Sequence, residues 1–435
     1  MKKVTRRTVL KGGTALVGGM AGILATGRAP AFAQGTTVHW IRWNDFVPAS
    51  DQLLRKELIP EGEKALGIKI NLETVNGNDL QPRITAAIQS GSGPDVFMLF
   101  NNHPQLYAAS LADVSDVAEA QDKAEGGYYP LVKSNSNDGK RWLSMPWTIV
   151  GGMIAYRKSW FDEVGSPEFP DTWQKYHEVG KKLKAKGRPI GQTLGHTFGD
   201  APTFTYPLLW SFGGKEVDES GKVVINSKET VDSVKFMTAF WKEAHDEGGL
   251  AWDDTNNNRA FLSQTISATL NGASIYIESL RNPDKYISEK GAQLKTDIQH
   301  AALPKGPAGQ FGFHLLQSHM LMKYSNNQEA AKKFLTWIHT PANYEKWFLS
   351  QKGFATPCTA KWETHKLWGE DPVMTIYRVA ARLGQAPGFA GPPNARSAEG
   401  LSKYIITDMY AKAVQGMPAE EAVKWAEGEL TKVYT

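Results

Sequence analysis

The sequence predicts an α/β protein built from two lobes, and two features of the chain support this. Strand-like and helix-like segments alternate regularly from about residue 35 onward. The 402 residues that follow position 33 of the 435-residue chain exceed the size at which one hydrophobic core keeps growing, so two lobes are expected. The one cysteine, Cys358, cannot form an internal disulfide, so buried apolar surface must supply the stability, and Cys358 is interpreted as a small buried hydrophobe.

The first 33 residues have the pattern of a secretory signal peptide. Arg6 and Arg7 precede an apolar, glycine-rich stretch over residues 12–26, which is too short for a membrane span, and Ala31-Phe32-Ala33 is a small-residue cleavage signal. The paired arginines resemble a Tat signal, and an ordinary Sec leader is the alternative. Either route predicts a periplasmic protein that begins at Gln34, after cleavage behind Ala33.

Removing the leader changes the charge of the chain. Six of the 49 basic residues lie in the leader, which has no acidic residue, so the mature chain has 43 basic and 45 acidic residues and a formal net charge of −2. Binding to nucleic acid or to an anionic membrane requires clustered Lys and Arg. Neither partner is therefore predicted.

The mature chain begins with five segments that alternate between strand and helix. In chain order they are a strand over 37–43, a helix over 50–66, a strand over 68–75, a helix over 79–90 and a strand over 96–100. The last strand is a continuous apolar run, which is typical of a parallel strand buried on both faces. Together the segments predict a βαβαβ unit with right-handed crossovers.

Asparagines follow each of these three predicted strands. Ligands of open parallel sheets bind beyond the carboxyl ends of the strands. The candidates at those ends are Trp43, Asn44, Asn78, Asn101 and Asn102. Because amides from three strands would meet at one edge of the sheet, we interpret these residues as ligand-binding, although asparagine is also common in loops for conformational reasons alone.

Two helices are predicted further along the chain. The first ends near His339, and Thr340-Pro341 then has the pattern of an N-cap followed by proline in the first turn. Tyr344, Trp347 and Phe348 follow at the spacing of a buried helix face. These aromatic residues are therefore predicted to belong to the core.

Several short segments follow one another between residues 40 and 357 in a characteristic order and spacing. They are Trp40-Ile41-Arg42-Trp43-Asn44, Ser90-Gly91-Ser92-Gly93-Pro94-Asp95, Tyr156-Arg157-Lys158, Phe204-Thr205-Tyr206-Pro207-Leu208, Leu270-Asn271-Gly272 and Gly353-Phe354-Ala355-Thr356-Pro357. In this order they resemble the bacterial extracellular solute-binding proteins of family 1, the periplasmic receptors of sugar-type ABC importers. The resemblance spans nearly the whole mature chain.

The resemblance implies a type II periplasmic binding protein fold, in which each of two lobes has a mainly parallel sheet flanked by helices and the ligand lies in the interlobe cleft. Lobe 1 is expected over residues 35–148 and 312–350, and lobe 2 over 149–311 and 351–435. It also implies a monomer without a cofactor or a metal. Such a receptor closes around its solute by a hinge motion and delivers it to an ABC permease and its ATPase subunits.

The resemblance also transfers individual site residues. Asn44 and Asn102 stand where maltodextrin receptors of the family have sugar-binding aspartates, and Thr203 stands at an aromatic position of their site. Ser274 replaces a tryptophan of those receptors, while Tyr276 lies nearby. These differences weaken the prediction of a maltodextrin and leave a carbohydrate, polyol or sugar derivative as the expected ligand.

Aromatic side chains are expected in the site because a sugar ring has hydroxyls at its rim and apolar C–H faces. The candidates are Trp43, Trp147, Trp210 and Tyr276. Each could also pack in the core, where large aromatic side chains are common. At least one of them is expected to stack on the ligand.

Two more candidates follow glycine-rich or proline-rich connections. His314 comes after the connection over residues 306–312, and Arg396 follows a proline-rich loop that resembles a ligand-contacting loop of the family. The Arg396 guanidinium could clamp a carboxylate or phosphate group of the ligand, or form an interlobe or surface ion pair.

Other ligands and an enzymatic function are the alternatives. The same fold could bind glycerol phosphate, a polyamine or iron, but the amide-rich strand ends lack the carboxylates that a polyamine needs, and Tyr128-Tyr129 lies in a polar, glycine-rich segment poorly suited to iron. The chain lacks nucleophile-elbow, phosphate-loop and zinc-helix motifs, so no catalytic residue is assigned. An exported glycoside hydrolase remains an alternative function, because the two carboxylates of such an enzyme cannot be recognised from sequence alone.

Overall fold

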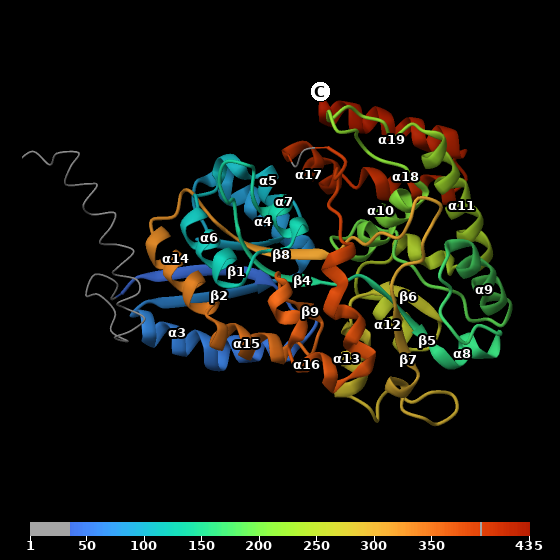
Figure 1. Ribbon diagram of the computed structural model, residues 1–435, viewed down its shortest axis with the longest axis horizontal. Helices are drawn as coiled ribbons and strands as arrows, with labels where there is room; N and C mark the ends of the chain where they lie inside the picture. The colour runs from blue at the N-terminus through green and yellow to red at the C-terminus, as the bar shows by residue number, and fades with distance from the viewer. Residues whose placement is uncertain (1–34, 392–393) are drawn as a thin grey trace, which may run out of the picture. The chain divides into compact units, whose positions relative to one another are not determined.

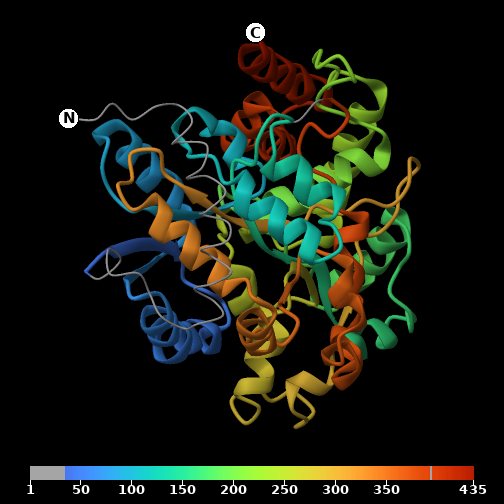
Figure 2. The same cartoon turned by 60° about the vertical axis from the view of Figure 1, so that its left-hand side comes forward.

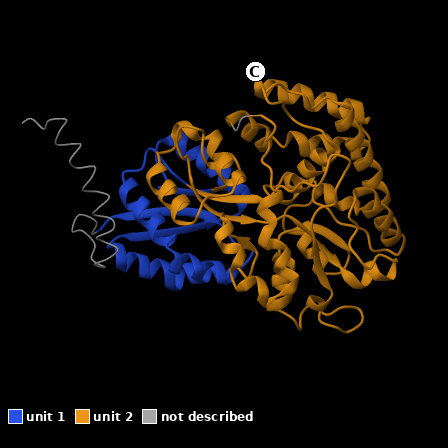
Figure 3. Cartoon of the chain, viewed as in Figure 1, with its two compact units in different colours: residues 1–98, 320–350 blue, residues 99–319, 351–435 orange. Residues whose placement is uncertain are grey.

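The computed structural model describes residues 35–391 and 394–435 (Figure 1). The predicted leader, with its paired arginines and its cleavage site, lies outside the described residues. The described chain forms two compact units, one of residues 35–98 with 320–350 and the other of residues 99–319 with 351–435 (Figure 3). The predicted lobe limits differ from this division over 99–148 and 312–319, and they stay a prediction.

The first unit begins with the predicted βαβαβ pattern. Strand β1 (Thr37–Trp43) pairs in parallel with β2 (Lys69–Val75) along its whole length, and β3 (Val96–Phe100) pairs in parallel with β1. Helices α2 (Pro48–Leu53), α3 (Ile59–Leu66) and α4 (Gly77–Ser90) supply the connections, with one π-helical stretch over Leu54–Leu58 between α2 and α3. The five predicted segments are confirmed, and only the π-helical stretch was not foreseen.

The two later helices of the first unit are also confirmed. They are α14 (Gln328–Ile338) and α15 (Pro341–Ser350). Tyr344, Trp347 and Phe348 are buried, as predicted for the apolar face of a helix. A Cβ at Gly62 of α3 would lie 2.9 Å from the Trp337 ring of α14, so only glycine allows this close packing of the two helices.

The larger sheet has six strands in the order β2-β1-β3-β8-β4-β9, and the boundary between the two units passes through β3 and β8. Strands β8 (Leu315–Leu321) and β4 (Met145–Val150) are antiparallel and entirely buried, and β9 (Ala355–Thr356) pairs with the end of β4.

The smaller sheet belongs to the second unit and corrects one detail of the prediction. Strand β5 (Met153–Arg157) lies between β6 (Ala268–Asn271) and β7 (Ile298–Ala301), and both pairings are antiparallel. A mainly parallel second sheet was therefore wrong. More than one hundred residues separate β5 from β6, so no short helical crossover forces the two strands to run in the same direction.

Helices of the second unit pack against strands of both sheets. The bounds of its helices are α5 (His103–Leu106), α6 (Ser115–Ala124), α7 (Pro130–Ser136), α8 (Lys158–Glu163), α9 (Trp173–Ala185), α10 (Asp200–Phe212), α11 (Lys228–Ala244), α12 (Asn256–Leu262), α13 (Ser274–Arg281), α16 (Leu367–Glu370), a 3₁₀ segment (Pro372–Leu383), α17 (Ala395–Ser402), α18 (Ile405–Val414) and α19 (Ala419–Tyr434). Helix α18 packs against α10, α11 and α19, with α19 in dark red in Figure 2. No helix within residues 35–391 or 394–435 is long and apolar enough to cross a membrane.

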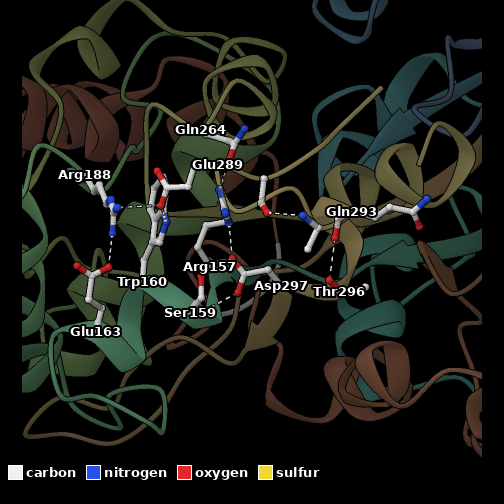
Figure 4. A network of polar contacts seen from close by, with 12 residues as sticks. Arg157, Ser159, Trp160, Glu163, Arg188, Gln264, Glu289, Gln293, Thr296 and Asp297 are labelled. Carbon is white, nitrogen blue, oxygen red and sulfur yellow. Dashed lines mark hydrogen bonds and ion pairs between the residues drawn. The ribbon is translucent and has the colours of Figure 1, made fainter. Parts of the chain in front are cut away.

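A network of charged and aromatic side chains fixes the end of β5 (Figure 4). The buried Arg157 Nε donates to Asp297 Oδ2 at 2.7 Å, and its guanidinium lies 4.3 Å from the centre of the Trp160 ring. Arg188 lies 4.5 Å from the same ring and pairs with Glu163 and with Glu289, which also accepts from Trp160 Nε1. Since the charges of this network are paired with one another, we interpret it as structural.

Candidate functional site

A cavity of about 590 Å³ lies within the second unit. Three parts of the chain line it: Asn102 just after β3, Tyr129 to Leu131 with Ser134 and Asn135 around α7, and most residues from Ala381 to Gly391 with Ser397 from the C-terminal part. This volume is in the range of sites for small molecules.

Two buried amide side chains face this cavity with unused hydrogen-bonding groups. Asn102 is 2% exposed, and its Nδ2 donates to Ser397 Oγ at 3.1 Å, but its Oδ1 has no partner among the described residues. Asn135 is 0% exposed, and neither its Oδ1 nor its Nδ2 has a partner there. Buried polar groups are almost always hydrogen-bonded in folded proteins. Among the described lining residues, these three amide atoms are thus the buried groups whose hydrogen-bonding capacity the protein leaves unused.

The end of β3 positions Asn102 through its neighbour Asn101. Asn101 adopts a left-handed backbone with φ of 52°, which asparagine tolerates better than most residues. Its backbone N–H donates to the Leu316 carbonyl at 2.7 Å, and its Oδ1 accepts from the Leu316 N–H at 3.2 Å. Asn101 thus ends the strand by binding β8, and Asn102 is the one of the pair that lines the cavity.

The cationic side chain in the cavity wall is neutralised by an ion pair. Arg382 Nε donates to Glu363 Oε1 at 2.9 Å, its Nη2 binds Glu363 Oε2, and Tyr129 Oη donates to Oε1 at 2.6 Å. Partial burial acts to raise the pKa of Glu363, but the hydrogen bonds from Arg382 and Tyr129 outweigh it and hold that pKa below its ordinary value. Glu363, which lies outside the lining, therefore pairs with Arg382, the one charged side chain among the described residues of the wall.

An aromatic side chain from the C-terminal part completes the wall. Phe389 packs edge to face on Trp210 with ring centres 5.2 Å apart. The loop that carries Phe389 is held by the buried Glu216, which accepts from the Gly388 N–H at 2.7 Å and from Trp210 Nε1 at 3.0 Å. Trp210 is thus part of the core behind the cavity, and Phe389 supplies the apolar surface in it.

His314 lies directly behind the wall. A Cβ at Gly384 would lie 3.0 Å from the His314 ring, and the Gly152 N–H donates to His314 Nδ1 at 3.1 Å. Burial lowers the pKa of His314 to about 4, so the ring is neutral at physiological pH. His314 therefore positions the β4–β5 connection beside the cavity.

A second polar group lies at the start of α10. Asp254 accepts the N–H groups of Gly199 at 3.1 Å and Asp200 at 2.7 Å, and Asn257 Nδ2 donates to Asp200 Oδ2 at 2.6 Å. Burial raises the pKa of Asp254 to about 6, and burial together with the neighbouring Asp254 raises the pKa of Asp200. The predicted residue Thr203 lies in the same turn, where its hydroxyl donates to the Gly199 carbonyl at 3.0 Å.

A family model described as bacterial extracellular solute-binding protein matches residues 48–345, which is more than half of the chain. The chain belongs to this family. The predicted family and solute-binding role are thereby confirmed.

Individual relatives of this solute-binding protein are distant. It is 22% identical to the probable ABC transporter-binding protein of Deinococcus radiodurans over 79% of this chain and 80% of that one. It is 28% identical to the diacetylchitobiose binding protein DasA of Streptomyces coelicolor, over 39% of each chain. The solved structure of maltose-bound MalE3 from T. maritima superposes with a TM-score of 0.75 at 23% identity, over 91% of this chain and 99% of that one. The superposition confirms the predicted fold class.

Other predicted residues of the solute-binding protein do not line the cavity. Trp147 is buried with its ring 5.3 Å from His319, and Tyr276 Oη donates to Asp371 Oδ2 at 2.8 Å. Arg396 Nη1 donates to the Tyr434 carbonyl at 2.6 Å, at the end of the chain. The guanidinium of Arg396 therefore stabilises the end of α19 in this structure.

The predicted residues of the first unit lie at the carboxyl ends of their strands, as expected. Trp43 is buried and packs edge to face against Phe46 at 5.3 Å. Asn44 is exposed, and its backbone N–H donates to the Val75 carbonyl at 2.7 Å. Asn78 is also exposed, in the first turn of α4. Their roles as ligand-binding residues stay predictions.

The sequence interpretation missed most of the cavity wall, including Tyr129, Asn135, Arg382 and Phe389. Tyr129-Pro130 was a visible signal, because proline in the first helical turn marks the start of α7. In the described ranges, no group of three or more His, Cys, Asp or Glu side chains is arranged to hold a metal ion.

Proposed function

We propose that this protein is the exported substrate-binding component of an ABC importer and that it binds a carbohydrate, polyol or sugar derivative in the cavity beside Asn102. The observation that carries the proposal is a cavity of small-molecule size, in a solute-binding family member, with buried amide groups that lack protein partners. The Deinococcus relative is named for ABC transport, and DasA is named for a sugar derivative.

The composition of the wall supports a sugar-like ligand. Amide groups of Asn102 and Gln385 can donate to and accept from hydroxyls, while Phe389 and Tyr129 offer aromatic surface. Sugar recognition needs this combination, because hydroxyls at the rim of the ring must be hydrogen-bonded while the apolar faces are covered.

Hinge closure is the proposed mechanism. The ligand would bridge the two predicted lobes, displace water and stabilise a closed form, which an inner-membrane permease recognises while its ATPase subunits supply the energy. We further propose that the mature protein is a periplasmic monomer that begins at Gln34 after cleavage of the leader.

Binding without turnover is favoured over glycoside hydrolysis. None of the described residues that line the cavity is an aspartate or glutamate, whereas hydrolysis of a glycosidic bond uses two carboxylates on either side of that bond. The carboxylate of Asp254 accepts two backbone N–H groups at the start of α10, which is a structural role.

A ligand screen on the mature chain tests the proposal. Residues 34–435 would be unfolded, freed of any carried ligand, refolded and titrated with maltose, diacetylchitobiose, ribitol, gluconate and glucose 6-phosphate in thermal-shift and calorimetric assays. A ligand that binds only the native state raises the free energy of unfolding by about 2.7 kcal/mol at one hundred times its Kd. We expect saturable binding of at least one compound, which is recovered unchanged. Binding of none by a correctly refolded sample, or conversion of the bound compound, would contradict the proposal.

A further inference from the structure

We propose that Asn135 is a specificity-determining residue of the cavity and that, with Asn102, it selects an uncharged polyhydroxyl ligand over anionic or cationic ones. This inference rests on the proposed function and names the charge class of its ligand. It is carried by the environment of the Asn135 amide, the pairing of the charge in the wall, and the hydrogen-bonding capacity of an amide.

The amide of Asn135 is completely buried and unused. Its exposed fraction is 0%, it lies in the last turn of α7, and both of its polar atoms lack a partner among the described residues. Exchanging the positions of the oxygen and nitrogen does not change this, because neither position is bonded. Burial of an amide without partners opposes folding, so the groups are matched to a polar molecule that enters the cavity.

The neighbouring polar side chain on α7 behaves differently. Ser134 also lines the cavity, but its hydroxyl donates to the Leu131 carbonyl at 2.9 Å. Asn102 has one used and one unused polar atom, since its Nδ2 donates to Ser397 Oγ and its Oδ1 has no partner among the described residues. The unused groups in this part of the wall are thus one complete amide and one further amide oxygen.

The wall provides no uncompensated charge for an ionic ligand. Arg382 is the cationic side chain that lines the cavity, and it makes a two-point ion pair with Glu363, which also accepts from Tyr129. A phosphate or carboxylate would have to lose its hydration against neutral amides or compete with Glu363 for the guanidinium. Burial of a charge against neutral amides costs hydration free energy that an uncharged ligand avoids. The Arg382 side chain is 61% exposed, so water screens its charge and an ion pair with a ligand there is weak.

The hydrogen-bonding capacity of the two amides also favours an uncharged ligand with hydroxyl groups. A hydroxyl both donates and accepts, so two neighbouring hydroxyls can satisfy Oδ1 and Nδ2 of Asn135 together and still donate to Asn102 Oδ1. An oxyanion only accepts, so it would leave both amide oxygens unpaired. An ammonium group only donates, so it would leave Asn135 Nδ2 unpaired.

Two substitutions at Asn135 test the inference on the mature protein. Asn135→Leu removes both polar atoms at similar size, and Asn135→Asp replaces the donor by an acceptor that is charged at neutral pH. Asn71→Leu, at an exposed position of β2, is the matched control. The wild type and the variants would be titrated with maltose, diacetylchitobiose and ribitol as uncharged probes, and with gluconate, glucose 6-phosphate and spermidine as charged probes.

We expect the wild type to bind an uncharged probe, Asn135→Leu to bind it at least tenfold more weakly, and Asn71→Leu to bind it as the wild type does. The thermal midpoint of ligand-free Asn135→Leu should equal or exceed that of the wild type, because an unpaired buried amide has been removed. We expect Asn135→Asp to lose affinity for the uncharged probe as well.

The outcomes separate the two proposals. Equal affinity of the wild type and Asn135→Leu for an uncharged probe would overturn the inference and leave the proposed function intact. Preference of the wild type for a charged probe would have the same consequence. A large fall in the thermal midpoint of Asn135→Leu would show that the amide has partners in the ligand-free protein, which also overturns the inference. Binding of no probe by the wild type would overturn the proposed function and the inference with it.

Discussion

The cavity wall and the start of α10 both contain buried polar side chains. Those at α10 are bonded to the protein, whereas in the described part of the chain both amide atoms of Asn135 and the amide oxygen of Asn102 in the wall are not. Asp254 accepts two backbone N–H groups, and Asn257 Nδ2 donates to Asp200 and to the Leu270 carbonyl. Asn135, by contrast, has no partner among the described residues for either of its amide atoms. This difference separates polar residues that hold the fold together from those that are available to a ligand. Substitutions in the two regions should therefore have opposite effects on stability.

The largest effect on the free energy of unfolding is expected from substitution of Asp254. Asp254→Ala would leave the N–H groups of Gly199 and Asp200 buried without their acceptor, and each unsatisfied group costs about 1 to 3 kcal/mol. We expect the free energy of unfolding, measured with urea, to fall by about 2 to 4 kcal/mol.

Asp254→Asn is the matched control for that prediction, because its side-chain oxygen can still accept one N–H group. It should recover part of the lost stability. If Asp254→Ala were as stable as the wild type, the start of α10 would not depend on this carboxylate, and the contrast with the cavity would fail.

The second effect concerns pH and His314. Burial lowers the pKa of this histidine to about 4, below the value of about 6.5 in an unfolded chain. Its contribution to stability is therefore present above pH 6.5 and is lost as the pH falls through 4, because the unfolded chain takes up the proton first. The shift corresponds to about 3 kcal/mol at most.

Comparison with His314→Gln isolates this contribution, since other histidines are also buried. The pKa values of His103 and His300 are lowered to about 4 by burial as well. We expect the loss of unfolding free energy between pH 7 and pH 4 to be smaller in His314→Gln than in the wild type. An identical pH dependence in the two proteins would show that His314 is accessible to protons in the folded state.

Asn135→Leu should change stability in the opposite direction to Asp254→Ala. Removal of an unpaired buried amide leaves the free energy of unfolding unchanged or raises it by about 1 kcal/mol, while a polar residue with partners would lose stability on the same substitution. Urea unfolding of the ligand-free protein measures the sign. A loss of more than about 1 kcal/mol would place Asn135 with the structural residues of α10.

The sequence could predict the strands of the first unit because their signals are local. The apolar run over 96–100 and the alternation over 68–75 report burial of the strand itself. The same reasoning could not separate Asn101 from Asn102, because the difference is a left-handed backbone at Asn101 and its bonds to Leu316.

Asn135 was missed because nothing near it in the sequence marks it. Its importance arises from residues about 30 positions before it and about 250 after it, which form the other walls of the cavity. Trp147 is the converse case: its residue type predicts a platform for a sugar ring, while in the structure its ring is buried beside His319. Its role in ligand binding stays a prediction. Residue type predicts what a side chain can do, whereas the tertiary structure decides whether its groups are already used.

The smallest effect on ligand affinity and stability is expected from substitution of Arg396, a side chain whose hydrogen-bonding groups are already used by the protein. Its guanidinium already donates to the Tyr434 carbonyl at 2.6 Å, and Arg396 does not line the cavity. Arg396→Ala should therefore change the Kd of any bound probe by less than about twofold and alter stability only slightly, as exposed side chains usually do. Calorimetric titration with a charged and an uncharged probe measures this directly. A tenfold loss confined to gluconate or glucose 6-phosphate would show that Arg396 leaves the end of α19 to clamp an anionic ligand, and would contradict the selection of an uncharged ligand by the amides.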